Sequence, residues 1–466
     1  MPGYSCSMKF SHSVFSWLSN NALQYGFFVV LALSIASSSL AGHLRERKLR
    51  RRNFLTHPTE VNRCSEILDG VTGLIGNTPL VRISSLSEAL GIEILGKAEF
   101  LNPGGSVKDR VALRMIQDAE RQGLLHPRTG FRIFEGTVGS TGISIATIAR
   151  ARGYDTTIIM PDDVAEEKVK ALLCLGAEVR RVRPASIVDQ KQYVNMARQA
   201  ALQFGVEDVA EGIEGMQLSH EIPTGSPSSV TTETLRAQTG ERIVDDQDDD
   251  PASKPRGFFA DQFENKSNFY AHYEGTGPEI WRQTSGKLHA FVSGAGTGGT
   301  IGGVGHYIKS MNKDIKVVLA DPEGSGLFNK VKYNVMYDRR EAEGTKRRHQ
   351  VDTVVEGIGI NRMTNNVSLA LPIVDDAFRI TDAEAVAMSR YLIKHDGLFL
   401  GSSSACNLVA CVKLARLLGW KEGQTIVTVL CDSGTRHYSK FWNDDYLRRA
   451  NIPIDETLIE TLLNTP

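Results

Sequence analysis

The sequence has few cysteines and almost no net charge, and each shortage excludes a class of protein. Six cysteines in 466 residues are too few for a disulfide-stabilised scaffold. No CxxC pair occurs, which excludes a zinc ribbon and a thioredoxin-type motif. Lys and Arg number 53 and Asp and Glu 54, and this balance argues against a broadly basic nucleic-acid binder. The length exceeds what one hydrophobic core usually supports, so we expect two or more domains.

The N-terminus carries a long uncharged and apolar stretch. Residues 25–42 lack charge over 18 positions, the lower end of a membrane-spanning helix, and residues 45–52 hold six basic side chains against one acid. Because basic residues stay cytosolic, we expect residues 1–58 to be a membrane anchor or targeting segment, with the rest of the chain facing the cytosol from the mitochondrial outer membrane. The alternatives are a matrix presequence, an anchor in the endoplasmic reticulum membrane and a secretory signal.

Apolar runs alternate with amphipathic patterns from about residue 60 to 214. Buried strands are predicted at 92–100, 131–136, 155–161 and 177–182, and helices at 111–125, 142–153 and 165–176, where Gly123, Gly153 and Gly176 would end them. This alternation is typical of βα units and a parallel sheet. Residues 214–256 form an acidic insertion, with six acids and one base at 241–250. Strands resume at 288–299 and 315–324 and end at 424–434.

The segment PGGSVKDR, 103–110, lies between a predicted strand and a predicted helix. Ser106 can cap that helix, and its free amides form an anion site. Lys108 lies in the first turn, where the positive end of the helix dipole lowers the pKa of its amine. A lysine of this kind suits a nucleophile or a Schiff base, and an ordinary exposed first-turn lysine is the alternative.

Three further segments are typical of ligand-binding loops. Residues 135–146 alternate glycines and hydroxyls and could surround a small anion, and 293–303 have the composition of a phosphate cradle. The second loop also contains G-x-G-x-x-G, with Asp321 about 20 residues later, which leaves a dinucleotide site open. Residues 432–434 end a buried strand, where α/β sheets bind ligands.

Together these motifs resemble the fold-type II pyridoxal-phosphate enzymes, specifically the cysteine synthase and cystathionine β-synthase family. The resemblance covers roughly residues 64–445 and includes GNTPLVRI (76–83), PGGSVKDR, DQFEN (261–265), GTGGT (296–300) and EGIGIN (356–361). It implies an α/β fold like that of tryptophan synthase β, with two three-layer αβα domains, and a homodimer. The catalytic region would span 59–449, with a smaller domain at about 100–212 inserted in a larger one at 59–99 and 257–449, and a tail at 450–466.

The resemblance also implies a set of site residues around pyridoxal 5′-phosphate. Lys108 would form the Schiff base and Ser433 would bond the pyridine nitrogen. The remaining cofactor contacts would come from Ser140, Gly296, Thr297, Gly298, Gly299, Thr300 and Gly357. The substrate would be bound by Thr137, Gly139, Thr141 and Gln262. No metal is expected.

Two positions depart from the family pattern TSGNTG: Val138 replaces the serine and Ser140 the asparagine. The segment EGTVGSTG, residues 135–142, resembles the corresponding segment of a fungal subgroup called cysteine synthase 2. The implied reaction makes cysteine from O-acetylserine and sulfide, by β-elimination to an aminoacrylate and sulfide addition. The alternatives are another β-replacement or elimination enzyme (cystathionine synthesis, serine or cysteine breakdown) and a non-catalytic, membrane-tethered binding module. The expected partners are a small amino acid, sulfide and the membrane, without nucleic acid.

Overall fold

The computed structural model describes residues 67–205, 255–337 and 353–464. The predicted N-terminal anchor at 1–58 and nearly all of the acidic insertion at 214–256 lie outside these residues. Among the helices of the described ranges, none combines the length and apolar character needed to cross a bilayer. Both sheets described below belong to one compact unit, Leu68–Pro466.

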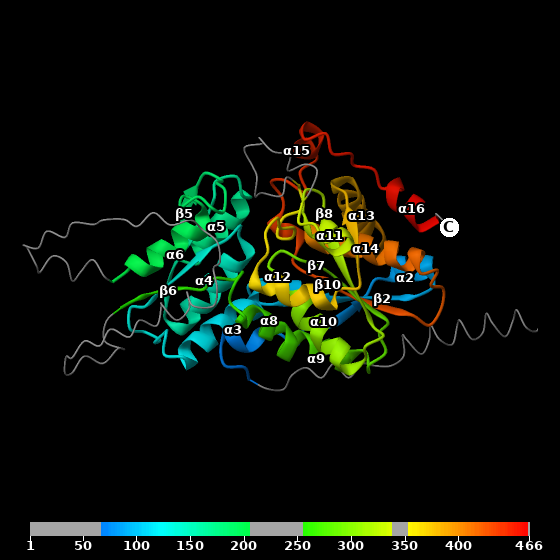
Figure 1. Cartoon of the computed structure of the whole chain (residues 1–466). Helices are drawn as coiled ribbons and strands as arrows, with labels where there is room; N and C mark the ends of the chain where they lie inside the picture. Colours follow the sequence, from blue (N-terminus) through cyan, green and yellow to red (C-terminus); the bar gives the residue numbers. More distant parts are fainter. Residues whose placement is uncertain (1–66, 206–254, 338–352, 465–466) are drawn as a thin grey trace, which may run out of the picture. The chain divides into compact units, whose positions relative to one another are not determined.

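The larger sheet has six strands in the order β1-β2-β10-β7-β8-β9. Figure 1 labels β2, β10, β7 and β8 of this sheet. Their bounds are Leu80–Arg82, Glu93–Ala98, Thr425–Leu430, Ala290–Gly294, Lys316–Pro322 and Asp376–Ile380 in that order. Every neighbouring pair is parallel except β1 and β2, which are antiparallel. The prediction of a parallel sheet is therefore correct for the interior, and the short edge strand β1 makes the sheet mixed.

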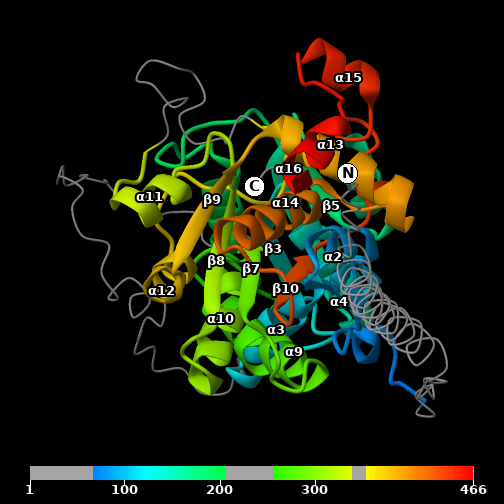
Figure 2. The ribbon, with the colours of Figure 1, turned by 90° about the vertical axis from the view of Figure 1, so that its right-hand side faces the viewer.

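Helices cover both faces of this sheet, which gives the three layers predicted. One apolar core includes α2 (Ser84–Leu90), α13 (Asp382–Asp396), α14 (Ser402–Leu417) and α16 (Thr457–Asn464). A second core includes α9 (Gly277–Gln283), α10 (Gly299–Met311), α11 (Leu327–Tyr333) and α12 (Asn365–Ala370). Figure 2 shows α13 and α14 on one side of strands β7 and β8, and α9 and α10 on the other.

The smaller sheet has four parallel strands in the order β5-β4-β3-β6. Their bounds are Glu178–Val182, Asp155–Pro161, Arg132–Gly136 and Gly257–Phe259. Helices α3 (Lys108–Arg121) and α4 (Ser140–Arg152) share one apolar core with it, and α5 (Glu166–Cys174) packs against α4. Helix α6 (Tyr193–Gln203) contacts β3, β4 and β6.

Three boundaries differ from the sequence prediction. Residues 257–259, predicted in the larger domain, form β6 and pair with β3 of the smaller sheet. Strand β5, predicted as buried, lies at the sheet edge and is half exposed. Residues 457–464, predicted as part of a tail, form helix α16, because Ile459 and Leu463 are four residues apart and both pack into the larger core.

Local signals set many of the element ends. Gly123, Gly153 and Gly176 all have positive φ angles just after α3, α4 and α5, which confirms their predicted role in ending these helices. The remaining short elements are η1 (Val71–Leu74), η2 (Glu99–Leu101), α8 (Ser267–Ala271), η4 (His272–Thr276), η6 (Leu371–Ile373), η7 (Gly434–Arg436) and α15 (Asp444–Arg449).

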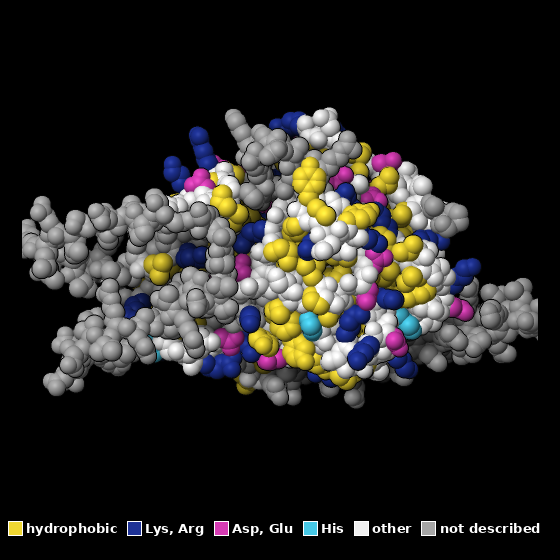
Figure 3. Space-filling view, in the orientation of Figure 1, with side chains coloured by type: hydrophobic (Ala, Val, Ile, Leu, Met, Phe, Trp, Pro, Cys, Tyr) yellow, Lys and Arg dark blue, Asp and Glu magenta, His cyan; other side chains and the backbone are white. Residues whose placement is uncertain are grey.

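The described surface carries charges of both signs, which agrees with the near balance of basic and acidic residues in the sequence. On the face drawn in Figure 3, basic and acidic side chains are interspersed with hydrophobic ones. Cys406 and Cys411 are buried and Cys431 is half-buried, and all three are free thiols. Burial raises the pKa of Cys411 to about 12 and that of Cys431 to about 11, so both thiols stay protonated at neutral pH.

Candidate active site

A cavity of about 300 Å³ opens where strands of both sheets end. Thr137 follows β3, Gly296 follows β7 and Cys431 follows β10, and all three line it. Loops that follow the carboxyl ends of parallel strands are the usual ligand site of open α/β sheets. A smaller cavity of about 20 Å³ adjoins it and shares Lys108, Gly296, Thr297 and Gly357 with the larger one.

Lys108 is the first residue of α3 and lines both cavities. The chain before it is tied to the end of β10, because Val107 N donates to Cys431 O at 3.1 Å and Ser106 forms a β-bridge with Asp432. The predicted cap is present in modified form: Ser106 Oγ accepts from Lys108 N at 3.3 Å, while Val107 occupies the N-cap position. Burial lowers the pKa of Lys108, so the neutral form of its amine, which is the nucleophilic one, is populated at a lower pH.

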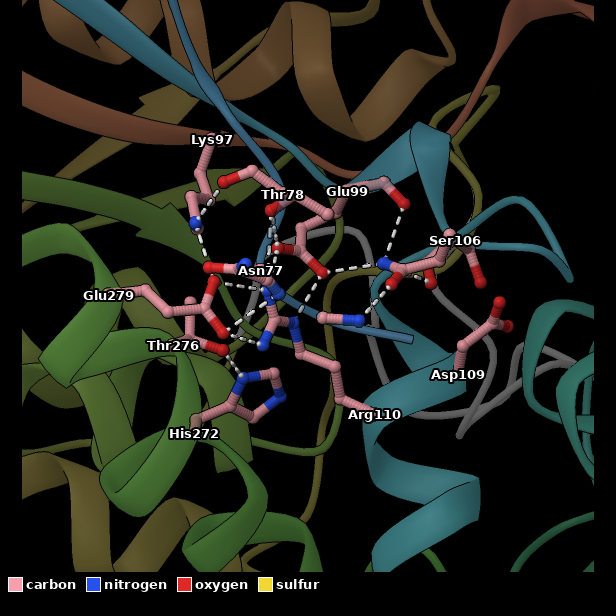
Figure 4. Close-up of polar contacts among 12 residues, drawn as sticks. Asn77, Thr78, Lys97, Glu99, Ser106, Asp109, Arg110, His272, Thr276 and Glu279 are labelled. Carbon is pink, nitrogen blue, oxygen red and sulfur yellow. Dashed lines mark hydrogen bonds and ion pairs between the residues drawn. The ribbon is translucent and has the colours of Figure 1, made fainter. Parts of the chain in front are cut away.

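A buried ion cluster holds the start of α3 (Figure 4). Arg110 Nε donates to Glu99 Oε2 at 2.8 Å, and Arg110 Nη1 donates to Glu279 Oε1 at 2.7 Å. Lys97 Nζ approaches Glu279 Oε2 at 2.6 Å. Burial alone would raise the pKa of Glu279, but Arg110 and Lys97 outweigh it and lower the pKa to about 2. The cluster links β2, α3 and α9, so it fixes the helix turn that carries Lys108.

The glycine loop after β7 leads directly into α10. Gly298 has a φ of 91°, and a Cβ there would lie 2.6 Å from Val367 N, so only glycine fits this close approach. Thr297 lines both cavities, and Gly298 and Thr300 line the smaller one. Gly299, the first residue of α10, lines neither. A helix N-terminus with free amides and two hydroxyls is suited to a phosphate.

The loop between β3 and α4 faces the same cavity. Thr137, Val138, Ser140 and Thr141 line it, whereas Gly139, with a φ of 134°, does not. Thr141 Oγ1 donates to Gln262 Oε1 at 2.6 Å, and Gln262 also lines the cavity. The structure therefore brings together residues of the smaller sheet that the sequence predicted as a substrate site.

Ser433 lies beside the cavity and lines neither pocket. Its Oγ accepts from Thr435 N at 3.3 Å and so caps the short helix η7. Its neighbour Asp432 lines the cavity, with Oδ2 3.1 Å from His437 Nε2. The role of Ser433 toward a pyridine nitrogen therefore stays a prediction.

Comparison with known proteins identifies the family. The sequence profile described as "Pyridoxal-phosphate dependent enzyme" matches residues 71–252 and 233–432. The chain belongs to this family. It is 52% identical over 387 residues to cysteine synthase 2 of Schizosaccharomyces pombe, which covers 83% of this chain and 87% of the relative. It is 54% identical over 377 residues to cysteine synthase 2 of Emericella nidulans, covering 81% and 80%. A Saccharomyces cerevisiae protein whose name includes "mitochondrial cysteine synthase" is 47% identical over 392 residues, covering 84% and 88%.

Pyridoxal phosphate is the cofactor of this family, and the cavity has the chemical groups to hold it. Lys108 supplies an amine of lowered pKa, and Thr297 and Thr300 stand at the helix N-terminus. Gly357 has a φ of 90° and lines both cavities, and a Cβ there would meet no protein atom within 4 Å. The space that a side chain would take at Gly357 is therefore open for a ligand.

Sequence analysis missed one charged cluster in the wall of this pyridoxal-phosphate enzyme's cavity. Lys168 of α5 forms a short ion pair with Glu356, and Lys440 Nζ lies 3.3 Å from Glu356 Oε1. All three line the cavity. In the sequence, Lys168 has no feature that distinguishes it from other helical lysines, and of these three residues only Glu356 lies in a recognised motif, EGIGIN. No local pattern therefore predicts that they form ion pairs.

Proposed function

We propose that this chain is a cysteine synthase that makes cysteine and acetate from O-acetylserine and sulfide. The observation that carries the proposal is a cavity lined by Lys108, the glycine loop after β7 and the hydroxyl loop after β3, in a family member whose relatives at 52% and 54% identity are named cysteine synthase 2. Under this proposal the cavity would supply an amine, a phosphate site and a carboxylate site.

The cofactor would be held from three directions. Amides and hydroxyls of residues 296–300 would bind its phosphate, Lys108 its aldehyde carbon, and Ser433 its pyridine nitrogen. Gly357 would leave room for a flat ring. Ser140 is shorter than the asparagine of the family pattern, so it would reach the phenolic oxygen through a water.

Lys108 would also move the proton of the reaction. Bound pyridoxal phosphate supplies an electron sink for a negative charge at the substrate α-carbon. The Lys108 amine would take the α-proton, which sets free the acetate group on the β-carbon, and would return the proton after sulfide has bonded to that carbon. The Thr137 hydroxyl and the backbone amides at Gly139 and Thr141 would hold the substrate carboxylate. Gln262, which accepts the proton of the Thr141 hydroxyl, would fix that side chain.

The direct test is sulfide-dependent formation of cysteine from O-acetylserine by the purified full chain. Cysteine and acetate in equal amounts support the proposal. Parallel reactions with serine and homocysteine, and with serine or cysteine alone, test cystathionine synthesis and amino-acid breakdown. A visible cofactor band without turnover of any of these substrates would contradict the proposal and would support a binding module.

We propose in addition that residues 1–58 direct the enzyme to mitochondria, with the anchored outer-membrane arrangement as the specific form, and that the enzyme is a homodimer. The name of the Saccharomyces cerevisiae relative supports the organelle. Protease treatment of intact mitochondria separates the arrangements: an anchored, cytosol-facing enzyme is digested, and a matrix enzyme survives. Light scattering of the purified chain measures the oligomeric state.

A further inference from the structure

Two buried side chains lie directly behind the hydroxyls of the glycine loop. Asn268 Nδ2 donates to Thr297 Oγ1 at 2.9 Å, and His272 Nε2 lies 3.1 Å from Thr300 Oγ1. Asn268 and His272 are both 0% exposed. They are four residues apart: Asn268 is the second residue of α8 and His272 the first of the π-helical turn His272–Thr276, so they lie on the same face one turn apart.

The backbone is shaped to allow these contacts. A Cβ at Gly299 would lie 2.0 Å from Asn268 Oδ1, and a Cβ at Gly303 would lie 2.7 Å from His272 Cβ. Both glycines belong to α10, so any larger residue at either position would push α10 away from the turn. Single-turn π-helices are uncommon and occur often at functional sites.

We infer that Asn268 and His272 are positioning residues for the phosphate of the cofactor. They orient the hydroxyl protons of Thr297 and Thr300 toward the anion. The inference rests on the proposed role of residues 296–300 and adds a second layer of residues to it.

The hydrogen-bond directions at Asn268 follow from its partners. Asn268 Nδ2 donates to the Gln262 carbonyl oxygen at 2.8 Å, and a carbonyl oxygen can only accept. The nitrogen of the Asn268 amide therefore faces both Gln262 and Thr297, and Thr297 Oγ1 must accept from it. The Thr297 hydroxyl proton is then free to point at the phosphate.

At His272 the direction depends on the tautomer. Burial, with the positive charges of Arg110 and Lys108, lowers the pKa of His272 well below its ordinary value, so the ring is neutral and carries one proton. Its Nδ1 lies 2.9 Å from Thr276 Oγ1, a contact drawn in Figure 4. If Thr276 donates to Nδ1, the proton lies on Nε2 and points at Thr300 Oγ1. The Thr300 proton is then available to the phosphate, which accepts hydrogen bonds only.

A double-mutant cycle on pyridoxal-phosphate affinity tests whether His272 acts through Thr300. In the full chain we expect His272→Leu to raise the dissociation constant about tenfold, because the Thr300 hydroxyl loses the partner that orients its proton and its hydrogen bond to the charged phosphate is weakened. In the Thr300→Val background the same change should add nothing. Asn268→Leu and Thr297→Val form the matching cycle. His306→Leu is the control, because within the described part of the chain His306 contacts Leu369 O at 2.9 Å and packs against Phe269, away from the glycine loop's hydroxyls.

The inference would be overturned if the two single substitutions raised the dissociation constant by factors that multiply in the double variant. It would also be overturned if His272→Leu left the dissociation constant unchanged. A second measurement needs no variant: ¹⁵N NMR of the cofactor-loaded chain should show His272 protonated on Nε2, and protonation on Nδ1 would overturn it. If the wild-type chain makes cysteine but the cycle is additive, only this inference fails. If the wild-type chain binds no pyridoxal phosphate, the proposed function fails with it.

Discussion

Lys168 and Glu356 form an ion pair between the two sheets of the enzyme. Lys168 comes from α5 of the smaller sheet, and Glu356 comes from the loop that precedes α12 at the larger sheet. The side chain of Lys168 is 3% exposed and that of Glu356 16%. Since both residues also line the cavity, the pair holds the two halves of its wall together.

The pair predicts an acid-dependent loss of stability. Burial alone would raise the pKa of Glu356, but Lys168, with His437 and Lys440, outweighs it and lowers the pKa from 4.5 to about 2. The folded value is below the unfolded one, so the contribution is complete above pH 4.5 and is lost as the pH falls toward 2. Denaturant unfolding from pH 6 to pH 2.5 should show this loss.

Glu356→Gln should remove that dependence. It leaves the buried Lys168 charge without its anion, and we expect about 3 kcal/mol less unfolding free energy at pH 7. Glu422→Gln, at an exposed residue, is the control and should change little. Equal pH profiles for wild type and Glu356→Gln would show that the pair does not contribute.

Lys108→Ala should abolish the visible Schiff-base absorbance and the activity. Lys108 is the one lysine of α3, and the two other lysines that line the cavity, Lys168 and Lys440, are both paired with Glu356. Absorbance spectra of the chain purified with pyridoxal phosphate make the measurement. Lys313→Ala, at an exposed residue, should keep the band. A Lys108→Ala chain that keeps the band would disprove the assignment of this lysine.

Arg110→Met should destabilise the enzyme by about 3–5 kcal/mol, because it leaves the buried carboxylates of Glu99 and Glu279 without their shared partner. Urea unfolding measures the loss. Arg114→Met on the same helix removes a more exposed pair with Asp118 and should cost no more than about 1 kcal/mol. Similar losses of unfolding free energy in both variants would mean that the burial of the Arg110 cluster does not account for its contribution to stability.

Val138→Ser should lower the KM for O-acetylserine by at least about tenfold, with kcat little changed. The added hydroxyl gives one more hydrogen bond to the substrate carboxylate, equivalent to about 1.5–3 kcal/mol. Val138 is partly buried against the apolar cluster around α5, so some loss of stability is expected. Val138→Ala removes the same packing without adding a hydroxyl, and its KM should not fall. A fall in both variants would mean that space rather than hydrogen bonding limits binding.

The local elements were largely predictable. Alternating apolar runs predicted β3, β4, β7, β8 and β10, and glycines after α3, α4 and α5 marked their ends. These signals are short-range, since helix periodicity, turn residues and strand propensity act over a few neighbours. For the same reason β6 and α16 were assigned wrongly: three residues give too little pattern for a strand, and α16 is stabilised by its contact with a core formed far away in the sequence.

The sequence by itself determined the candidate site: the lysine at the start of a helix, the hydroxyl loop and the glycine loop. Their residue types and spacing follow from the chain, because each loop joins one strand to one helix. Only the tertiary structure decided which side chains support them. Lys168 meets Glu356, His272 meets Thr300 and Arg110 meets Glu279 across separations of 188, 28 and 169 residues. Such pairs form because burial brings charged and polar groups together from different elements and requires each to have a partner, a condition that no local pattern records.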